Sequence, residues 1–105
     1  MILTSTVEQL SDGKAVIELS GPLSLGTSLK VLDSQIQNLI AGEVSDVLLD
    51  LSKVDYADSA GLGMLVHTYG LLKKKQGKLT LKGVQPRVME LLKLTAVDTL
   101  MTIEA

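Results

Sequence analysis

The chain has 105 residues, a net charge of −2, no cysteine and a single histidine. This length allows one domain with a core of its own, spanning residues 1–105. The small net charge provides no basic surface for nucleic acid, and the lack of cysteine excludes a disulfide framework and a thiolate metal site. Because the sequence shows neither a signal peptide nor an apolar run of the ~20 residues that span a bilayer, we expect a cytoplasmic protein without membrane insertion, metal or cofactor.

The first part of the chain predicts two strands and a helix. Residues 2–9 have a weak strand pattern, and a Ser-Asp-Gly-Lys turn joins them to a second strand at 15–20, where apolar and polar residues alternate. Apolar residues then recur at helical spacing over residues 24–40, beginning with Leu25. Gly42 is well placed to end this helix.

The second part of the chain alternates strands with helices. The most hydrophobic strand, 47–51, precedes the longest amphipathic helix, 59–76. A strand at 78–82 precedes a short helix that starts at Pro86, a residue that suits a first helical turn. Apolar alternation over 101–103 predicts a short last strand, so the element order is ββαβαβαβ.

Alternating polarity in the predicted strands indicates how the layers are arranged. In this order one hairpin is followed by three strand–helix–strand crossovers. Such crossovers are right-handed and join parallel strands, so most neighbouring strands are parallel. A parallel sheet that is covered on both faces has continuous apolar strands, whereas four strands here carry polar residues at alternate positions, including Glu18, Asp50, Lys78 and Thr102. We therefore expect an α/β fold: a mixed, mainly parallel sheet of four or five strands, with helices wound onto one face and water on the other.

The segment Asp58–Gly63 joins the most hydrophobic strand to the longest helix. The first backbone N–H groups of a helix lack intrahelical partners and favour negative charge, so Asp58 or Ser59 can serve as the N-cap. Glycine costs roughly 0.5–1 kcal/mol inside a helix relative to alanine, and Gly61 and Gly63 therefore suggest that something approaches this backbone closely. The segment is a plain helix cap, an anion site or a serine that another protein modifies.

The residues present argue against two functions of this segment, nucleotide binding and nucleophilic catalysis. Gly61-Leu62-Gly63 lacks the third glycine of a dinucleotide-binding motif and the Gly-Lys-Ser/Thr ending of a P-loop, and carboxylates such as Asp55 would repel a phosphate ligand. As a nucleophile, Ser59 could use only His67, whose backbone lies roughly 12 Å away along the same helix, beyond hydrogen-bond reach. We therefore expect neither a nucleotide-binding protein nor an enzyme.

The helix at 59–76 has an apolar stripe that should face the sheet, formed by Leu62, Leu65, Val66, Tyr69 and Leu72. Met64 and Leu71 lie off this stripe, where they form either peripheral packing or an exposed apolar part of a partner surface. The lysine run 73–75 is interpreted as a complement to the dipole of its own helix, rather than as a lipid or nucleic-acid patch.

The segment Val47–Gly63 resembles the core of bacterial anti-sigma factor antagonists, the free-standing members of the STAS domain family. The resemblance extends to Leu79–Gly83, Val88–Leu94 and Ala96–Val97, and so covers most of the chain. Its most specific part is the Asp-Ser-Ala-Gly-Leu-Gly element that follows a leucine-rich strand. The family fold, a sheet with helices wound onto one side, agrees with the alternation of the strands.

The resemblance implies a phosphorylation switch. The phosphorylated residue of the family is the hydroxyl residue directly after the aspartate, which is Ser59 here. The unphosphorylated protein binds an anti-sigma factor, a serine kinase of the histidine-kinase-like ATPase type, and frees the sigma factor; phosphorylation abolishes binding and a serine phosphatase restores it. The expected partner surface comprises Ser24, Asp58, Ser59, Ala60, Gly61, Gly63 and Met64.

One departure from the family pattern leaves an alternative open. After the second strand the family commonly has an aspartate that helps to contact the kinase, and Ser24 stands at that position in Gly21-Pro22-Leu23-Ser24. Either a charged contact is missing or the partner differs. The alternative is a constitutive STAS interaction subunit, for example of a lipid-transport ATPase complex, in which Ser59 is only a helix cap.

Overall fold

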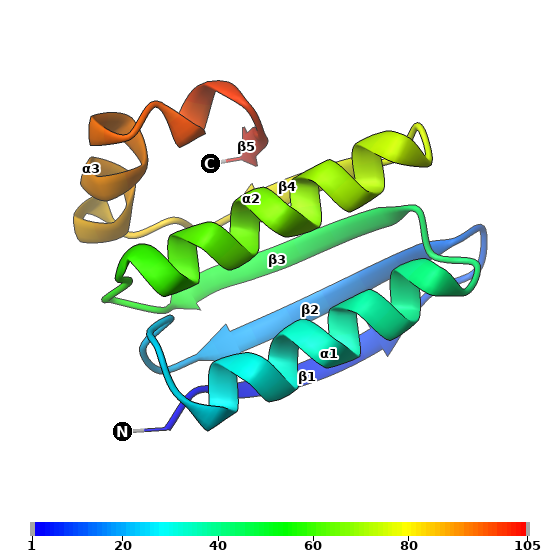
Figure 1. Ribbon diagram of the computed structural model, residues 1–105, viewed down its shortest axis with the longest axis horizontal. Helices are drawn as coiled ribbons and strands as arrows, with labels where there is room; N and C mark the ends of the chain where they lie inside the picture. The colour runs from blue at the N-terminus through cyan, green and yellow to red at the C-terminus, as the bar shows by residue number, and fades with distance from the viewer. Residues whose placement is uncertain (1, 105) are drawn as a thin grey trace.

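The computed structural model describes residues 2–104 of the chain (Figure 1). Its elements are β1 (Thr4–Gln9), β2 (Lys14–Ser20), α1 (Thr27–Ala41), β3 (Asp46–Lys53), α2 (Ser59–Lys74), β4 (Lys78–Lys82), α3 (Pro86–Leu94), the short 3-10 helix η1 (Val97–Thr99) and β5 (Thr102–Glu104). The strands form one sheet in the order β1-β2-β3-β4-β5, in which β1 is antiparallel to β2 and the later pairs are parallel. The expected element order and the mixed, mainly parallel sheet are confirmed.

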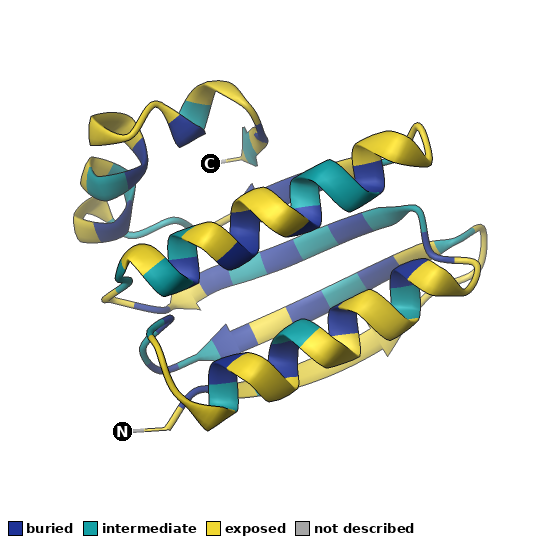
Figure 2. Ribbon diagram, in the orientation of Figure 1, coloured by how far each residue is buried: buried dark blue, intermediate teal, exposed yellow. Residues whose placement is uncertain are grey.

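The long helices lie on one face of the sheet, with α1 in front of β1 and β2 and α2 in front of β3 and β4 (Figure 1). Burial alternates along the central strands (Figure 2). One register row across β2, β3 and β4 is fully buried and the next row is charged: Ile17, Leu49 and Leu81 are followed by Glu18, Asp50 and Lys82. The prediction of helices on one face and polar side chains on the other is confirmed.

Helix α1 begins at Thr27, later than the predicted start at Ser24. The residues before it run as an extended loop, in which Leu23 is fully buried and forms a parallel β-bridge with Ala57. Leu25, predicted to lie on the apolar face of the helix, is 75% exposed. That prediction is wrong because the backbone N–H groups of Leu23 and Leu25 bond to the segment before α2, which holds them out of the helix.

The buried face of α2 differs from the predicted stripe. Its buried residues are Gly61, Met64, Leu65, Thr68 and Leu72. Two predictions are therefore wrong. Val66, predicted to lie on the buried stripe, is 37% exposed, and Met64, predicted to lie off it, is only 6% exposed. The reason is that Gly61 packs against the backbone of Leu23, and this contact sets the rotation of the helix so that positions three, four, seven and eleven residues after Gly61 face the sheet. The half-buried residues of the helix are Ala60, Leu62, Tyr69, Gly70 and Leu71.

The remaining bounds lie close to the predicted ones. β3 extends to Lys53, beyond the predicted end at Leu51, and α2 ends at Lys74, before the predicted Gln76. α3 begins at Pro86 as expected. Among residues 2–104, no helix has both the length and the apolar character needed to cross a membrane.

Candidate functional site

Two loops at the carboxyl ends of β2 and β3 converge beside the start of α2 (Figure 1). The N–H of Leu23 donates to the carbonyl of Tyr56 at 2.9 Å, and the N–H of Asp58 donates to the carbonyl of Leu23 at 3.2 Å. Both bonds flank the β-bridge between Leu23 and Ala57. The loops are therefore fixed to one another, at the end of the strands where α/β folds commonly place their sites.

The Asp58 carboxylate connects these loops to α2. Its Oδ1 accepts hydrogen bonds from the N–H groups of Ala60 and Gly61, and its Oδ2 accepts one from the N–H of Leu25, all at 3.0 Å. Asp58 is therefore the N-cap of α2. The N–H groups of Leu25 and then Gly61 hold the pKa of the Asp58 carboxyl below its usual value, because they favour its charged form. We call these three bonds the Asp58 cap.

Ser59 is the first residue of α2, and its side chain is exposed. Either Asp58 or Ser59 was a possible cap from the sequence. The bonds to the free N–H groups of the first turn are made by the Asp58 carboxylate. The Ser59 hydroxyl is therefore not required for the cap, and it lies at the surface, accessible to another protein.

The two glycines in the first turn of α2 have different surroundings. A Cβ built on Gly61 would lie 2.0 Å from the carbonyl oxygen of Leu23, so internal packing against this loop explains the glycine. Gly63 is exposed, and among residues 2–104 a Cβ there would meet no atom within 4 Å beyond its chain neighbours and the nearby backbone of its own helix. Gly61 and Met64 are both buried. For Met64 the structure therefore favours packing over an exposed apolar surface, and a contact of either residue with a partner stays a prediction.

Ser24 reaches the same end of the molecule from a distant part of the sequence. It is half-buried and lies between Leu23 and Leu25, both of which bond to the segment before α2. Ala60 is half-buried and packs against the core. The structure thus brings the predicted residue Ser24 to the side of the Asp58–Ser59 junction.

Three residues beside the Asp58–Ser59 junction were not predicted from the sequence as part of the candidate site. Leu25 and Tyr56 are exposed, at 75% and 43%, and the Arg87 guanidinium lies 5.6 Å from the centre of the Tyr56 ring, within the range of a cation–π interaction. The Gln85 amide donates to the carbonyl of Ser52 at 2.7 Å, which fixes the start of α3 to the end of β3. The signal in the sequence was the aromatic residue Tyr56 just before the Asp58–Ser59 junction. The structure shows that it is exposed, and exposed apolar groups often mark interfaces.

Charge at this end of the molecule is mixed. Asp55 is exposed in the same loop as Asp58, and Arg87 lies across from Tyr56. Within residues 2–104, the His, Asp and Glu side chains form no cluster of three that could hold a metal ion. The chemistry that the site offers is a free hydroxyl, an apolar rim and the N-terminus of a helix.

Comparison with known proteins identifies one family over nearly the whole chain. The family model described as the STAS domain matches residues 5–105. The chain belongs to the STAS domain family. The anti-sigma-B factor antagonist of Bacillus subtilis is 28% identical over 102 residues, a match that covers 79% of this chain and 94% of that protein.

Two further relatives extend the comparison. The intermembrane phospholipid transport system binding protein MlaB of Escherichia coli is 44% identical over 46 residues, which cover 44% of this chain and 47% of MlaB. The anti-sigma factor antagonist SpoIIAA, in its unphosphorylated form, aligns with a TM-score of 0.79 at 18% identity over 97% of this chain and 88% of SpoIIAA. The phosphorylated form of SpoIIAA from Bacillus aligns with the same TM-score. At this identity the SpoIIAA structures show a shared fold.

Proposed function

We propose that the chain is a single-domain, cytoplasmic anti-sigma factor antagonist whose binding is switched off by phosphorylation of Ser59. The observation that carries this proposal is the division of roles at the start of α2. Asp58 caps the helix, so Ser59 is exposed at its first position with a hydroxyl that the fold does not use. The similarity to the antagonist of Bacillus subtilis supports the same role. The protein acts by binding rather than as an enzyme.

A phosphate on Ser59 would change the surface more than the fold. It adds about −1.5 to −2 charge and three acceptor oxygens. The N–H groups of Ala60 and Gly61 already donate to Asp58, so they do not draw the phosphate into the structure. The positive end of the α2 dipole offsets part of the added charge within the protein. The phosphate therefore disrupts a close interface and leaves the antagonist folded.

The proposed partner is an anti-sigma factor that is a serine kinase of the histidine-kinase-like ATPase type, with a serine phosphatase that reverses its action. The contact surface comprises Ser24, Leu25, Tyr56, Asp58, Ser59, Ala60 and Gly63, with Gly61 and Met64 beneath it. Since Leu25 and Tyr56 are exposed apolar groups, we expect the kinase to cover them with apolar side chains. Ser24 offers a neutral hydroxyl where the family commonly has an aspartate, so this contact is a hydrogen bond without charge.

Phosphorylation by an anti-sigma factor kinase encoded beside this chain tests the proposal. After incubation with the kinase and ATP, intact mass spectrometry should show one added phosphate on the wild type and none on Ser59→Ala. Ser24→Ala is the matched control, because Ser24 is a second hydroxyl on the same surface and this variant should still take one phosphate. The phosphorylated wild type should no longer bind the kinase. Unmodified wild type that stays bound to the kinase in the presence of ATP would contradict the switch.

A second candidate function is a constitutive subunit of a lipid-transport ATPase complex. The observation that favours it is the 44% identity to MlaB over 46 residues. In this role the Asp58 cap orders the contact surface and Ser59 is never modified. Co-purification of a transport ATPase with the wild type and equally with Ser59→Asp, with no phosphate on the wild type recovered from cells, would favour this role over the switch.

A further inference from the structure

The two edges of the sheet differ in their protection. β5 has three residues, whereas β1 has six. Natural edge strands are commonly protected by lysine, proline or a β-bulge. β1 contains neither lysine nor proline, and it pairs with β2 in an unbroken register from Thr4 to Gln9. β1 is therefore the edge at which another strand can add.

The register of the hairpin fixes which backbone groups of β1 point outward. The N–H of Leu10 donates to the carbonyl of Lys14 at 2.7 Å, so these residues form a hydrogen-bonded pair, and such pairs alternate with non-bonded pairs along an antiparallel ladder. The residues whose backbone groups face β2 are therefore Thr4, Thr6 and Glu8. Those whose N–H and C=O groups face away from the sheet are Ser5, Val7 and Gln9.

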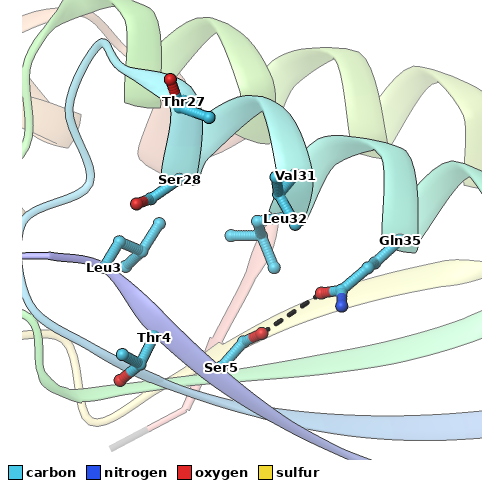
Figure 3. Close-up of a pocket in the computed structure, with 8 residues that line it drawn as sticks. All are labelled: Leu3, Thr4, Ser5, Thr27, Ser28, Val31, Leu32 and Gln35. Atoms are coloured by element: carbon cyan, nitrogen blue, oxygen red, sulfur yellow. Dashed lines mark hydrogen bonds between the residues drawn. The ribbon is translucent and has the colours of Figure 1, made fainter.

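Helix α1 leaves a groove along this edge, in two parts that meet at Gln35. One part, between the start of β1 and the first half of α1, is drawn in Figure 3, where the Ser5 hydroxyl donates to Oε1 of Gln35 at 3.2 Å. Val31, which is 53% exposed, lies on one side of Gln35, and Leu39 lies on the other. Glu43, at the far end, is the one charged residue among those that line the two parts.

We propose that this edge binds a second copy of the chain, with the two β1 strands antiparallel about a two-fold axis through Thr6. Such an axis is the commonest symmetry of a homodimer, and it requires a self-complementary patch. In this register Ser5 lies opposite Val7 of the second copy and Leu3 lies opposite Gln9, so the outward backbone groups from Leu3 to Gln9 all find partners. The single charge of β1, Glu8, lies opposite Thr4 rather than opposite another carboxylate.

The same axis makes α1 complementary to its copy. A continuous sheet keeps both α1 helices on one face, antiparallel to one another. The bond between Ser5 and Gln35 places Gln35 near the axis, so Val31 of each chain approaches Leu39 of the other and the exposed apolar groups become covered. Glu43 then lies toward the start of the other α1, which has neither a side-chain cap nor an acidic residue in its first turn. A carboxylate is favoured at such a helix start.

The proposed dimer leaves the Asp58–Ser59 surface accessible. β1 is the outer strand of the sheet on the side of α1, whereas α2 lies over β3 and β4 (Figure 1). Each dimer therefore presents two Ser59 hydroxyls on surfaces that the dimer contact does not cover. The inference is independent of the proposed phosphorylation switch.

Cysteine cross-linking tests this register, because the natural chain has no cysteine. Thr6→Cys places two thiols opposite one another in a non-hydrogen-bonded pair, with Cα atoms about 4.5 Å apart, within the range of a disulfide. Thr4→Cys, the matched control on the same face of the strand, places them about 14 Å apart. Mild oxidation should give a disulfide-linked dimer of Thr6→Cys and no cross-link in Thr4→Cys. Equal cross-linking of the two variants, or none of Thr6→Cys, overturns the register.

Sedimentation of the full chain tests the dimer itself. The wild type should sediment as a dimer at ~100 µM, within the range of a specific interface. Thr6→Lys brings two like charges together at the axis and should weaken the dimer at least about tenfold. Thr4→Lys faces Glu8 of the second copy and should dimerise at least as tightly as the wild type. Circular dichroism establishes that each variant is folded. A folded wild type that remains monomeric, or that pairs only with an added strand peptide, overturns the proposal.

Discussion

The two ends of α2 are held by charged side chains of opposite sign. At the start, the Asp58 carboxylate accepts from the backbone N–H groups of Leu25, Ala60 and Gly61. At the end, the Lys75 ammonium donates to the backbone carbonyls of Ile40, Gly42 and Val44. Asp58 ties α2 to the loop before α1, and Lys75 ties it to the loop after α1. Each charge thus satisfies backbone groups that a helix end or a loop leaves free.

A glycine accompanies each of these charges at a close backbone contact. A Cβ on Gly61 would lie 2.0 Å from the carbonyl oxygen of Leu23, and a Cβ on Gly77 would lie 1.8 Å from that of Ser45. The ends differ in what surrounds the anchor. Only the Asp58 end places a serine next to the anchoring residue and an exposed leucine on the loop it holds. The comparison shows that the same kind of anchor can lie within the fold alone or beside an exposed hydroxyl and an exposed apolar side chain.

The largest expected loss of stability comes from adding a methyl group at the two close backbone contacts, those of Gly61 and Gly77. Gly61→Ala and Gly77→Ala should each lower the free energy of unfolding by about 3 kcal/mol, because the added methyl group meets a backbone carbonyl that cannot move freely. Gly63→Ala and Gly70→Ala are the matched controls in the same helix, since their Cβ positions are open. They should stabilise by up to about 1 kcal/mol. Urea unfolding measures all four, and a loss below ~1 kcal/mol at Gly61 would show that the loops are not rigidly joined.

Removal of the Asp58 carboxylate should have the next largest effect. Asp58→Ala loses the N-cap and the bond to Leu25, so we expect a loss of about 2 kcal/mol in the free energy of unfolding. Hydrogen exchange at the amide of Leu25 should become faster, whereas exchange of the amides in the middle of β3 should stay as slow as in the wild type. Unchanged protection at Leu25 would mean that the loop is ordered without Asp58.

The pH dependence of this cap has a definite sign. The folded protein holds the pKa of Asp58 below its ordinary value of 3.8, so the charge-dependent stabilisation is complete above that value. It is lost as the pH falls through the lower pKa of the folded state. Asp58→Asn should therefore be less stable than the wild type at neutral pH, and the difference should shrink steadily below about pH 4. A difference that persists unchanged at about pH 2 would assign the effect to shape rather than to charge.

The opposite anchor should contribute less. Lys75 is exposed, so the three bonds of its ammonium are weakened by solvent, and Lys75→Met should cost about 1 kcal/mol. Lys74→Met, one residue earlier and also exposed, should change the free energy of unfolding by less than about 0.5 kcal/mol. Equal effects of the two substitutions would indicate a general effect of helix charge rather than the bonds to the end of α1.

The smallest effect on stability is expected at the proposed switch. Ser59→Asp adds a carboxylate at the first position of α2, where the helix dipole favours it, so the free energy of unfolding should change by less than about 0.5 kcal/mol. Binding to the anti-sigma factor should nevertheless fall sharply, as measured by titration calorimetry. A variant that unfolds instead would make Ser59 chiefly structural.

The sheet could be predicted from the sequence because alternation in single strands reports directly on which faces are covered. The rotation of α2 could not, since it depends on Gly61 meeting the loop at Leu23, a contact between residues far apart in the sequence. For the same reason the sequence does not show the tertiary contacts of the lysine run 73–75. Lys75 bonds to the end of α1 rather than only complementing the dipole of its own helix.

The site was predictable where its residues are adjacent in the sequence. Asp58 and Ser59 lie side by side, and the cap and the exposed hydroxyl follow from local backbone geometry. Leu25 and Arg87 could not be found this way, because α1 begins later than its apolar spacing suggests and α3 reaches Tyr56 only through the fold. Local rules identify the hydroxyl, and tertiary contacts decide which apolar groups surround it.

The strand order of the sheet has a consequence for how the chain folds. The order in space, β1-β2-β3-β4-β5, is the order in sequence, so each new strand adds to the one made just before it. Each parallel pair still joins distant residues, as Ile17 and Leu49 are, so its loop-closure entropy is paid before the pairing forms and folding is slower than for a helical bundle. During synthesis, the β1–β2 hairpin and α1 can dock before β4 leaves the ribosome. The sheet then extends from one side only, and no strand has to insert between two that are already paired.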